Sequence, residues 1–328
     1  MPAGSINRRS VLQGASVALF SPALLRRASA QRQQTIKIVY PFAAGGAGDA
    51  AGRIVADQIG IGLAVPTIVE NRTGAAGRIG TKSVSIAEPD GTTLLYTSNP
   101  PLSIYPHSYP SLEYDPVRDF APISLIATFD VALAVWPQMN INTIAELVSW
   151  AKQNPTKASY GSPGAGGLGH FFAVMFAMTT GVNFQHVSYR GGSAAVNDLI
   201  GGQIPMAVVT LGDVVELHKA GRARILAVSG GQRSSLLPDV PTFKESGVTV
   251  EGQGWYALYA PAKTSAETID RINKVVVQRL AAAEVRDRLL KLNVVPQTST
   301  PAQLAELQSA DSRRWEPVVK ASGFTPDQ

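Results

Sequence analysis

The sequence predicts an α/β fold in which mainly parallel sheets are flanked by helices. Short runs rich in β-branched residues recur along the chain, and longer segments with the apolar periodicity of helices lie between them. Such alternation is typical of parallel strands joined by right-handed crossovers. It fits one doubly wound sheet as well as two lobes, because no Gly/Ser-rich or Pro-rich linker separates autonomous halves.

The expected elements follow one another along the whole chain. The expected strands are Ile36–Tyr40, Thr67–Glu70, Thr93–Thr97, Val131–Trp136, Ala158–Gly161, Gln185–Ser188, Met206–Thr210 and Arg224–Ser229. The expected helices are Asp49–Gly62, Gly77–Ala87, Thr143–Gln153, Gly169–Thr180, Ser193–Gly201, Val214–Ala220 and Ala266–Leu290.

Two extended apolar stretches, Ile123–Val135 and Trp255–Ala260, favour two lobes over one sheet. Each can run from one sheet into another. We therefore expect lobe 1 to comprise residues 31–130 and 256–328 and lobe 2 to comprise residues 131–255, with a hinge and a cleft between them. Long central strands of a single sheet would produce a similar pattern.

The N-terminus has the pattern of an export signal. Arg8-Arg9 precedes a mostly apolar run that ends at Leu25, and Ala28-Ser29-Ala30 supplies the small residues that a signal peptidase accepts. We expect residues 1–30 to be a twin-arginine type signal peptide, cleaved after Ala30, and the mature protein to reside in the periplasm. The alternatives are the general secretory route and a basic N-terminal helix of a cytosolic protein.

Charge and cysteine content exclude several functions. Residues 1–30 contain four arginines and no acid, so removing them lowers the formal charge from +5 to +1 and leaves no reason to expect nucleic acid. Without cysteine there is no disulfide, thiolate metal site or cysteine nucleophile. The four histidines show no H-E-x-x-H pattern. We expect a monomer with no metal and no cofactor.

A glycine-rich loop follows the first expected strand, from Tyr40 to Asp49, and leads into a helix. Backbone N–H groups at a helix start stabilise anions, and ligands of open α/β sheets bind beyond the carboxyl ends of the strands. Asp49 can contact a ligand or simply cap the helix.

A second loop of this kind runs from Tyr160 to His170. Two such loops in opposing lobes would clamp a carboxylate through backbone amides. His170 can donate to an anion or satisfy local backbone, and the alternative for each loop is an ordinary turn between strand and helix.

Gly164-x-Gly166-x-x-Gly169 also matches the dinucleotide-binding fingerprint. Tyr189-Arg190 stands where an acidic residue would contact the ribose of NAD. Because an arginine can instead bind the 2′-phosphate of NADP, an exported NADP-dependent oxidoreductase is the rival hypothesis. The sequence near this fingerprint offers no convincing proton-transfer residue, and the chain contains no G-x-S-x-G motif, so nothing else favours catalysis.

Two charged residues at further strand ends are also candidates. Arg190 can pair with a second ligand carboxylate or be solvent-exposed, and Asp213 can cap a helix or contact the ligand.

A series of short motifs follows in a fixed order along the chain: Tyr40-Pro41 with Gly45-Gly46-x-x-Asp49, Glu70-Asn71-Arg72 with Gly74-Ala75-Ala76-Gly77, Ala87-x-x-Asp90-Gly91-Thr92-Thr93-Leu94, the loop Ser162–His170, Tyr189-x-Gly191, Asp198–Gly202, Leu237–Thr242, Glu245-x-Gly247, Trp255-Tyr256 and Ala260-Pro261. In this order and spacing they resemble the substrate-binding proteins of tripartite tricarboxylate transporters, the Bug family, over essentially the whole mature length of the chain.

The resemblance implies a type II periplasmic-binding-protein fold, no catalysis, and a small carboxylate ligand passed to membrane permease subunits. A ligand-loaded receptor for a membrane sensor kinase is the alternative. The contacts that it implies are Phe42, Ala43, Gly45, Gly46, Asp49, Ser98, Asn99, Ser162, Gly164, Gly166, Gly167, His170, Tyr189, Arg190 and Asp213. The chain departs from the family pattern at Gly167, where a hydroxyl residue is common, and at Arg190, where Lys is common.

Overall fold

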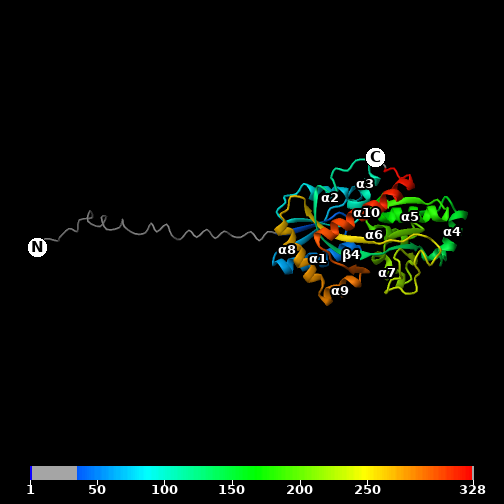
Figure 1. Cartoon of the computed structure of the whole chain (residues 1–328). Helices are drawn as coiled ribbons and strands as arrows, with labels where there is room; N and C mark the ends of the chain where they lie inside the picture. Colours follow the sequence, from blue (N-terminus) through cyan, green and yellow to red (C-terminus); the bar gives the residue numbers. More distant parts are fainter. Residues whose placement is uncertain (2–34, 327–328) are drawn as a thin grey trace. The chain divides into compact units, whose positions relative to one another are not determined.

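The computed structural model describes Met1 and residues 35–326, of which residues 35–326 form two β-sheets with helices packed on them (Figure 1). The export pair Arg8-Arg9, the signal peptide and the cleavage after Ala30 lie outside the described residues. Within residues 35–326, no helix combines the length and apolar character that crossing a membrane requires.

The first sheet has six strands in the order β11-β4-β10-β3-β1-β2. Their bounds are β1 Ile36–Tyr40, β2 Thr67–Asn71, β3 Thr93–Ser98, β4 Phe120–Phe129, β10 Gly254–Pro261 and β11 Val294–Pro296. The helical segments of this part are α1 Ala47–Leu63, η1 Ala75–Gly77, α2 Arg78–Ser85, η2 Pro100–Ile104, α3 Tyr105–Ser108, α8 Ala266–Leu280, α9 Ala283–Leu290 and α10 Pro301–Ser322.

The second sheet has five strands in the order β7-β6-β8-β5-β9. Their bounds are β5 Val131–Val135, β6 Ser159–Pro163, β7 Gln185–Tyr189, β8 Met206–Thr210 and β9 Arg224–Val228. The helical segments are η3 Pro137–Met139, α4 Ile144–Gln153, α5 Leu168–Thr180, α6 Gly192–Ile200 and α7 Leu211–Lys219. The expected strands and helices are thus present, except that Ala266–Leu290 forms two helices, while β11 and α10 were not expected.

Strand direction corrects the prediction of mainly parallel sheets, because both sheets are mixed. In the first sheet β10 is antiparallel to β3 and β4, and in the second β5 is antiparallel to β8 and β9. The cause is the path of the chain between the sheets. Strand β4 ends where the two sheets meet. Its continuation β5 therefore starts there and runs into the second sheet, antiparallel to β8 and β9, which end there. On the chain's return, β10 also starts there and runs into the first sheet, antiparallel to β3 and β4.

The two expected crossings have different outcomes. Ile123–Val135 does change sheet, because β4 and β5 are separated only by Asp130. Trp255–Ala260 lies wholly in β10 of the first sheet, so the prediction that it crosses was wrong. The chain returns instead through residues 229–253, where turns and irregular segments, which include Pro238 and Pro241, replace a continuous strand.

Helix α10 is anchored to the first sheet through a buried carboxylate. Asp311 is 7% exposed and accepts hydrogen bonds from Ser103 Oγ at 2.7 Å and from Trp255 Nε1 at 3.1 Å. It also accepts from Asn99 Nδ2 at 2.9 Å and from Trp315 Nε1 of its own helix at 3.0 Å. Four buried donors therefore depend on one side chain.

Replacing Asp311 with Ala should lower the free energy of unfolding by about 3–5 kcal/mol, because it leaves buried donors without an acceptor. Denaturant titration measures the loss. The exposed Asp270→Ala on α8 is the control; equal stabilities of the two variants would contradict the anchoring role.

Candidate functional site

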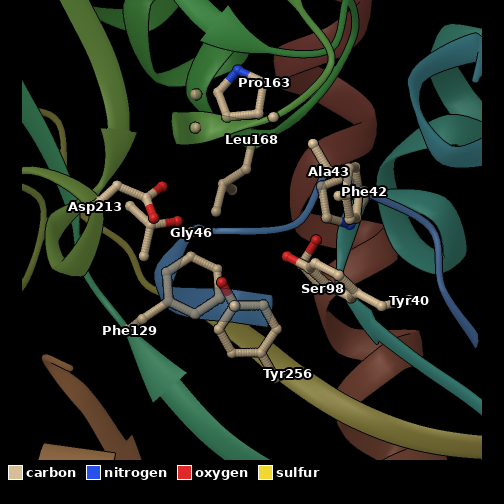
Figure 2. A pocket seen from close by; sticks show the side chains of 16 residues that line it. Tyr40, Phe42, Ala43, Gly46, Ser98, Phe129, Pro163, Leu168, Asp213 and Tyr256 are labelled. Carbon is tan, nitrogen blue, oxygen red and sulfur yellow. The ribbon is translucent and has the colours of Figure 1, made fainter. Parts of the chain in front are cut away.

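A cavity of about 60 Å³ lies where strands of both sheets end and helices begin (Figure 2). The lining residues are Tyr40, Phe42, Ala43, Gly46, Gly48, Ser98, Pro100, Phe129, Pro163, Leu168, Gly169, Gly191, Gly192, Thr210, Asp213 and Tyr256.

Four helices begin at this cavity. The N-caps of α1, α5, α6 and α7 are Gly46, Gly167, Gly191 and Thr210, and none of these caps its helix with a side-chain hydrogen bond. Backbone amides at a helix start, together with the helix dipole, stabilise negative charge. No Lys, Arg or His is among the lining residues, so backbone groups supply the positive potential.

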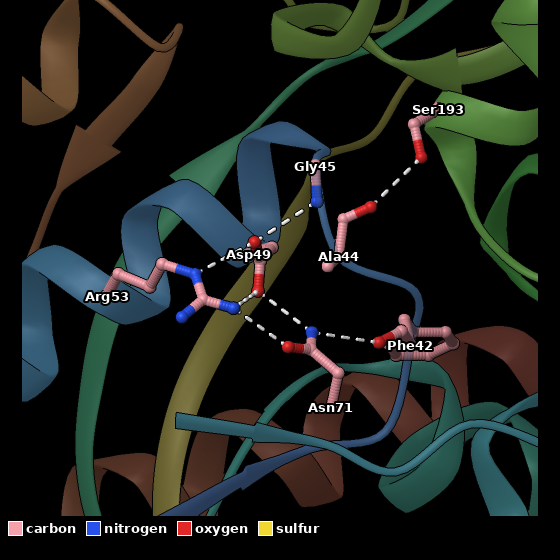
Figure 3. A network of polar contacts seen from close by, with 7 residues as sticks. All are labelled: Phe42, Ala44, Gly45, Asp49, Arg53, Asn71 and Ser193. Atoms are coloured by element: carbon pink, nitrogen blue, oxygen red, sulfur yellow. Dashed lines mark hydrogen bonds and ion pairs between the residues drawn. The ribbon is translucent and has the colours of Figure 1, made fainter. Parts of the chain in front are cut away.

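Asp49 holds the first glycine loop from behind (Figure 3). Its Oδ2 accepts from the Gly45 amide and from Arg53 Nε, both at 3.1 Å. Its Oδ1 accepts from Asn71 Nδ2 at 2.8 Å and from Arg53 Nη2 at 3.1 Å. Burial alone would raise the pKa of Asp49, but these hydrogen bonds outweigh it and lower the pKa. Asp49 is therefore ionised, and both of its oxygens are engaged in fixing the loop.

His170 holds the second glycine loop in a similar way. Its Nδ1 accepts from the Gly166 amide at 2.9 Å, so the proton of the neutral ring lies on Nε2. The ring stacks on His186 at 4.0 Å between centroids, and His186 Nε2 lies 2.8 Å from Ser162 Oγ. Burial lowers the pKa of His170 to about 3 and that of His186 to about 4. His170 is thus a neutral support for the loop.

The predicted contact residues divide into two groups. Phe42, Ala43, Gly46, Ser98 and Asp213 line the cavity. The others do not: Gly45, Asp49, Asn99, Ser162, Gly164, Gly166, Gly167, His170, Tyr189 and Arg190.

Three residues of the second group have other surroundings. Asn99 is buried and donates to Asp311. Tyr189 donates to Asp198 Oδ2 at 2.7 Å, and burial followed by this contact raises its pKa to about 12. The Arg190 side chain is exposed, while its carbonyl accepts from the Ala43 amide at 3.4 Å.

Asp213 joins the two sheets at the cavity. It belongs to the first turn of α7, and its Oδ1 accepts from the Ala47 amide of α1 at 2.7 Å. Burial raises the pKa of Asp213 to about 6, against the effect of the Ala47 hydrogen bond.

Aromatic residues of the first sheet form a cavity wall that sequence reasoning missed. Phe129 and Tyr256 lie 4.4 Å apart between ring centroids, and Leu168 points toward them from α5 (Figure 2). The Tyr256 hydroxyl is hydrogen-bonded to Tyr40 and Thr210. Tyr40 and Thr210 are the last residues of expected strands. Because ligands of α/β sheets bind beyond the carboxyl ends of the strands, this position could have identified both as site residues. Phe129 and Tyr256 lie inside apolar stretches that also suit a core.

Comparison with known proteins identifies the family. The sequence model of one protein family, the tripartite tricarboxylate transporter family receptor, matches residues 51–324. The chain belongs to this family. A Pseudomonas sp. (strain P51) relative, the UPF0065 protein in the tcbD-tcbE intergenic region, is 32% identical over 318 residues, covering 96% of this chain and 94% of the relative.

Solved structures agree with this assignment. The periplasmic binding protein BugD matches with a TM-score of 0.85 and 29% identity, covering 89% of this chain and 99% of BugD. R. palustris Rpa4515 with adipate matches with a TM-score of 0.86 and 28% identity, over 89% and 98% of the two chains. MatC from Rhodopseudomonas palustris with bound malate matches with a TM-score of 0.83 and 27% identity, over 87% and 98%. The chain therefore has the two-lobed fold of periplasmic binding proteins.

Folding lowers the pKa of His170, so the protein should become less stable as the pH falls. An unfolded histidine takes up a proton below about pH 6.5, whereas folded His170 does so only near 3. The free energy of unfolding should thus lose up to about 1.4 kcal/mol per pH unit between these values. His170→Asn keeps an acceptor for Gly166 and should remove this contribution. Denaturant titrations from pH 7.5 to 4.5 measure it; identical slopes for both proteins would contradict the assignment.

Proposed function

We propose that this chain is a periplasmic receptor that binds a small carboxylate between its lobes and delivers it to the membrane permease of a tripartite tricarboxylate-type transporter. Organic, amino and aromatic acids are the candidate ligands. The observation that carries the proposal is the meeting of four helix starts at one cavity, none of them capped by the side chain of its own N-cap residue. Two similar structures hold the carboxylates adipate and malate.

In this proposal, lobe 1 comprises residues 31–130 and 256–328, and lobe 2 comprises residues 131–255. Contacts across the cavity suit closure around a ligand: Ser193 Oγ donates to the Ala44 carbonyl at 3.4 Å (Figure 3), and the Ala43 amide donates to the Arg190 carbonyl. A ligand that makes additional contacts in the closed form shifts the lobes toward it. Export by the signal of residues 1–30 would place the receptor in the periplasm.

A receptor is favoured over an NADP-dependent oxidoreductase by the surroundings of the fingerprint loop. A Cβ atom at Gly164 would lie 3.0 Å from Ala76 Cβ, and one at Gly166 would lie 3.1 Å from the Phe324 ring. These glycines therefore face lobe 1 residues at close range. A dinucleotide pyrophosphate would need the same space next to the loop backbone.

A thermal-shift screen of the full-length protein against a carboxylate library, with NAD and NADP as controls, tests the proposal. A ligand at 100-fold its Kd should stabilise the protein by about 2.7 kcal/mol. We expect stabilisation by one class of carboxylate. Stabilisation by NADP alone would overturn the proposal in favour of an oxidoreductase.

Gly46→Val should reduce carboxylate affinity by a hundredfold or more while the protein stays folded. A Cβ atom there would lie 2.9 Å from Asp213 Oδ1, so the larger side chain would fill the cavity beside the α1 amides. Calorimetry measures the affinity. Gly231→Val, at an exposed position outside the cavity, is the matched control. Wild-type affinity of Gly46→Val would refute the location of the site.

A further inference from the structure

Asp213 occupies a position that suits an anion. Its Oδ1 accepts from the Ala47 amide at the start of α1, and in Figure 2 its carboxylate lies beside Gly46. A Cβ atom at Gly192, at the start of α6, would overlap Oδ2. Two glycines from opposite lobes thus make room for this one carboxylate. Its Oδ2 accepts no hydrogen bond from the residues that the structure describes.

Among residues 35–326, no basic side chain forms a hydrogen bond or ion pair with this carboxylate. From α1, Asp49 and Arg53 are bonded to each other and to Asn71. From β1 and β10, Tyr40 and Tyr256 face Asp213, and burial raises the pKa of both phenols, so they stay neutral.

The remaining neighbouring elements add no positive charge to the cavity either. From α6, Ser193 is uncharged, and exposed Arg190 before it does not line the cavity. On α7 itself, Glu216 is exposed and pairs with Lys219.

A ligand carboxylate bound at the same helix starts lies close to Asp213, because Asp213 itself lines the cavity there and already accepts from the first amide of α1. Two carboxylates in contact cannot both stay ionised without a cation, and such a pair retains one proton. The raised pKa of Asp213 shows that this group accepts a proton more readily than an ordinary aspartate.

We propose that Asp213 couples ligand binding to proton uptake: the ligand carboxylate and the Asp213 carboxyl group share one proton taken from solvent. This inference rests on the proposed carboxylate-receptor function. It makes Asp213 a specificity-determining residue, because the cavity then favours groups that can accept a hydrogen bond from a carboxylic acid. Above about pH 6, where free Asp213 is mostly ionised, affinity should fall by up to tenfold per pH unit.

Calorimetry of the full-length protein with benzoate, hexanoate, adipate and malate tests this inference. Titrations at pH 7.5 in buffers of different ionisation enthalpy count the protons. We expect each acid that binds to bring close to one proton into the complex. Asp213→Asn should bind the same acids roughly tenfold more tightly at pH 7.5, with no proton uptake and little dependence on pH. Glu216→Gln, one turn later on the same helix, removes an equal charge outside the cavity and should behave as wild type.

Three other results would count against the inference. Binding of an acid by the wild-type protein without proton uptake would overturn it, and this measurement does not depend on the variant folding. Weaker binding by a folded Asp213→Asn would also overturn it and would indicate that Asp213 pairs with a ligand donor such as an ammonium group. Failure of both proteins to bind any carboxylate from pH 5.5 to 8 would instead remove the proposed function, and the inference with it.

Discussion

The chain passes from β4 to β5 with only Asp130 between them, and the positions of the site residues depend on this direct passage. Strand β4 ends at the boundary between the sheets, as do β1 and β3 on one side and β6, β7 and β8 on the other. Each parallel strand that ends there is followed by a loop and a helix that starts there. Amides from two independent sheets therefore meet at one cavity, which neither sheet could form alone.

The loops present their backbone to the cavity because polar side chains bind them from behind. Asp49 fixes the first loop with the help of Arg53 and Asn71, and His170 fixes the second through the Gly166 amide. A charged Lys or Arg in the cavity would be a flexible alternative. Fixed amides lose no side-chain entropy on binding, and their geometry is set before the ligand arrives.

The sequence predicted the strands well because β-branched runs between glycine loops are strong local signals. It also predicted a ligand-binding loop around Gly46, since ligands bind at the carboxyl ends of parallel strands, and in the structure Gly46 lines the cavity. It could not show that Gly164 and Gly166 face the opposite lobe, which depends on contacts with Ala76 and Phe324 far along the chain. Asp49 fitted a cap or a ligand contact equally, and only its tertiary partners show that it fixes the loop.

Helix α10 escaped prediction for a related reason. Its buried face includes Gln308 and Asp311, so the apolar stripe that marks an amphipathic helix is interrupted. Asp311 binds the helix to the first sheet, while Trp315 packs on Phe171 and Phe172 of α5 beside the second. One helix therefore touches both lobes. Breaking the Asp311 bonds would leave four buried donors unsatisfied. If the lobes rotate relative to each other, the movement must therefore occur at the contact between Trp315 and the phenylalanines of α5.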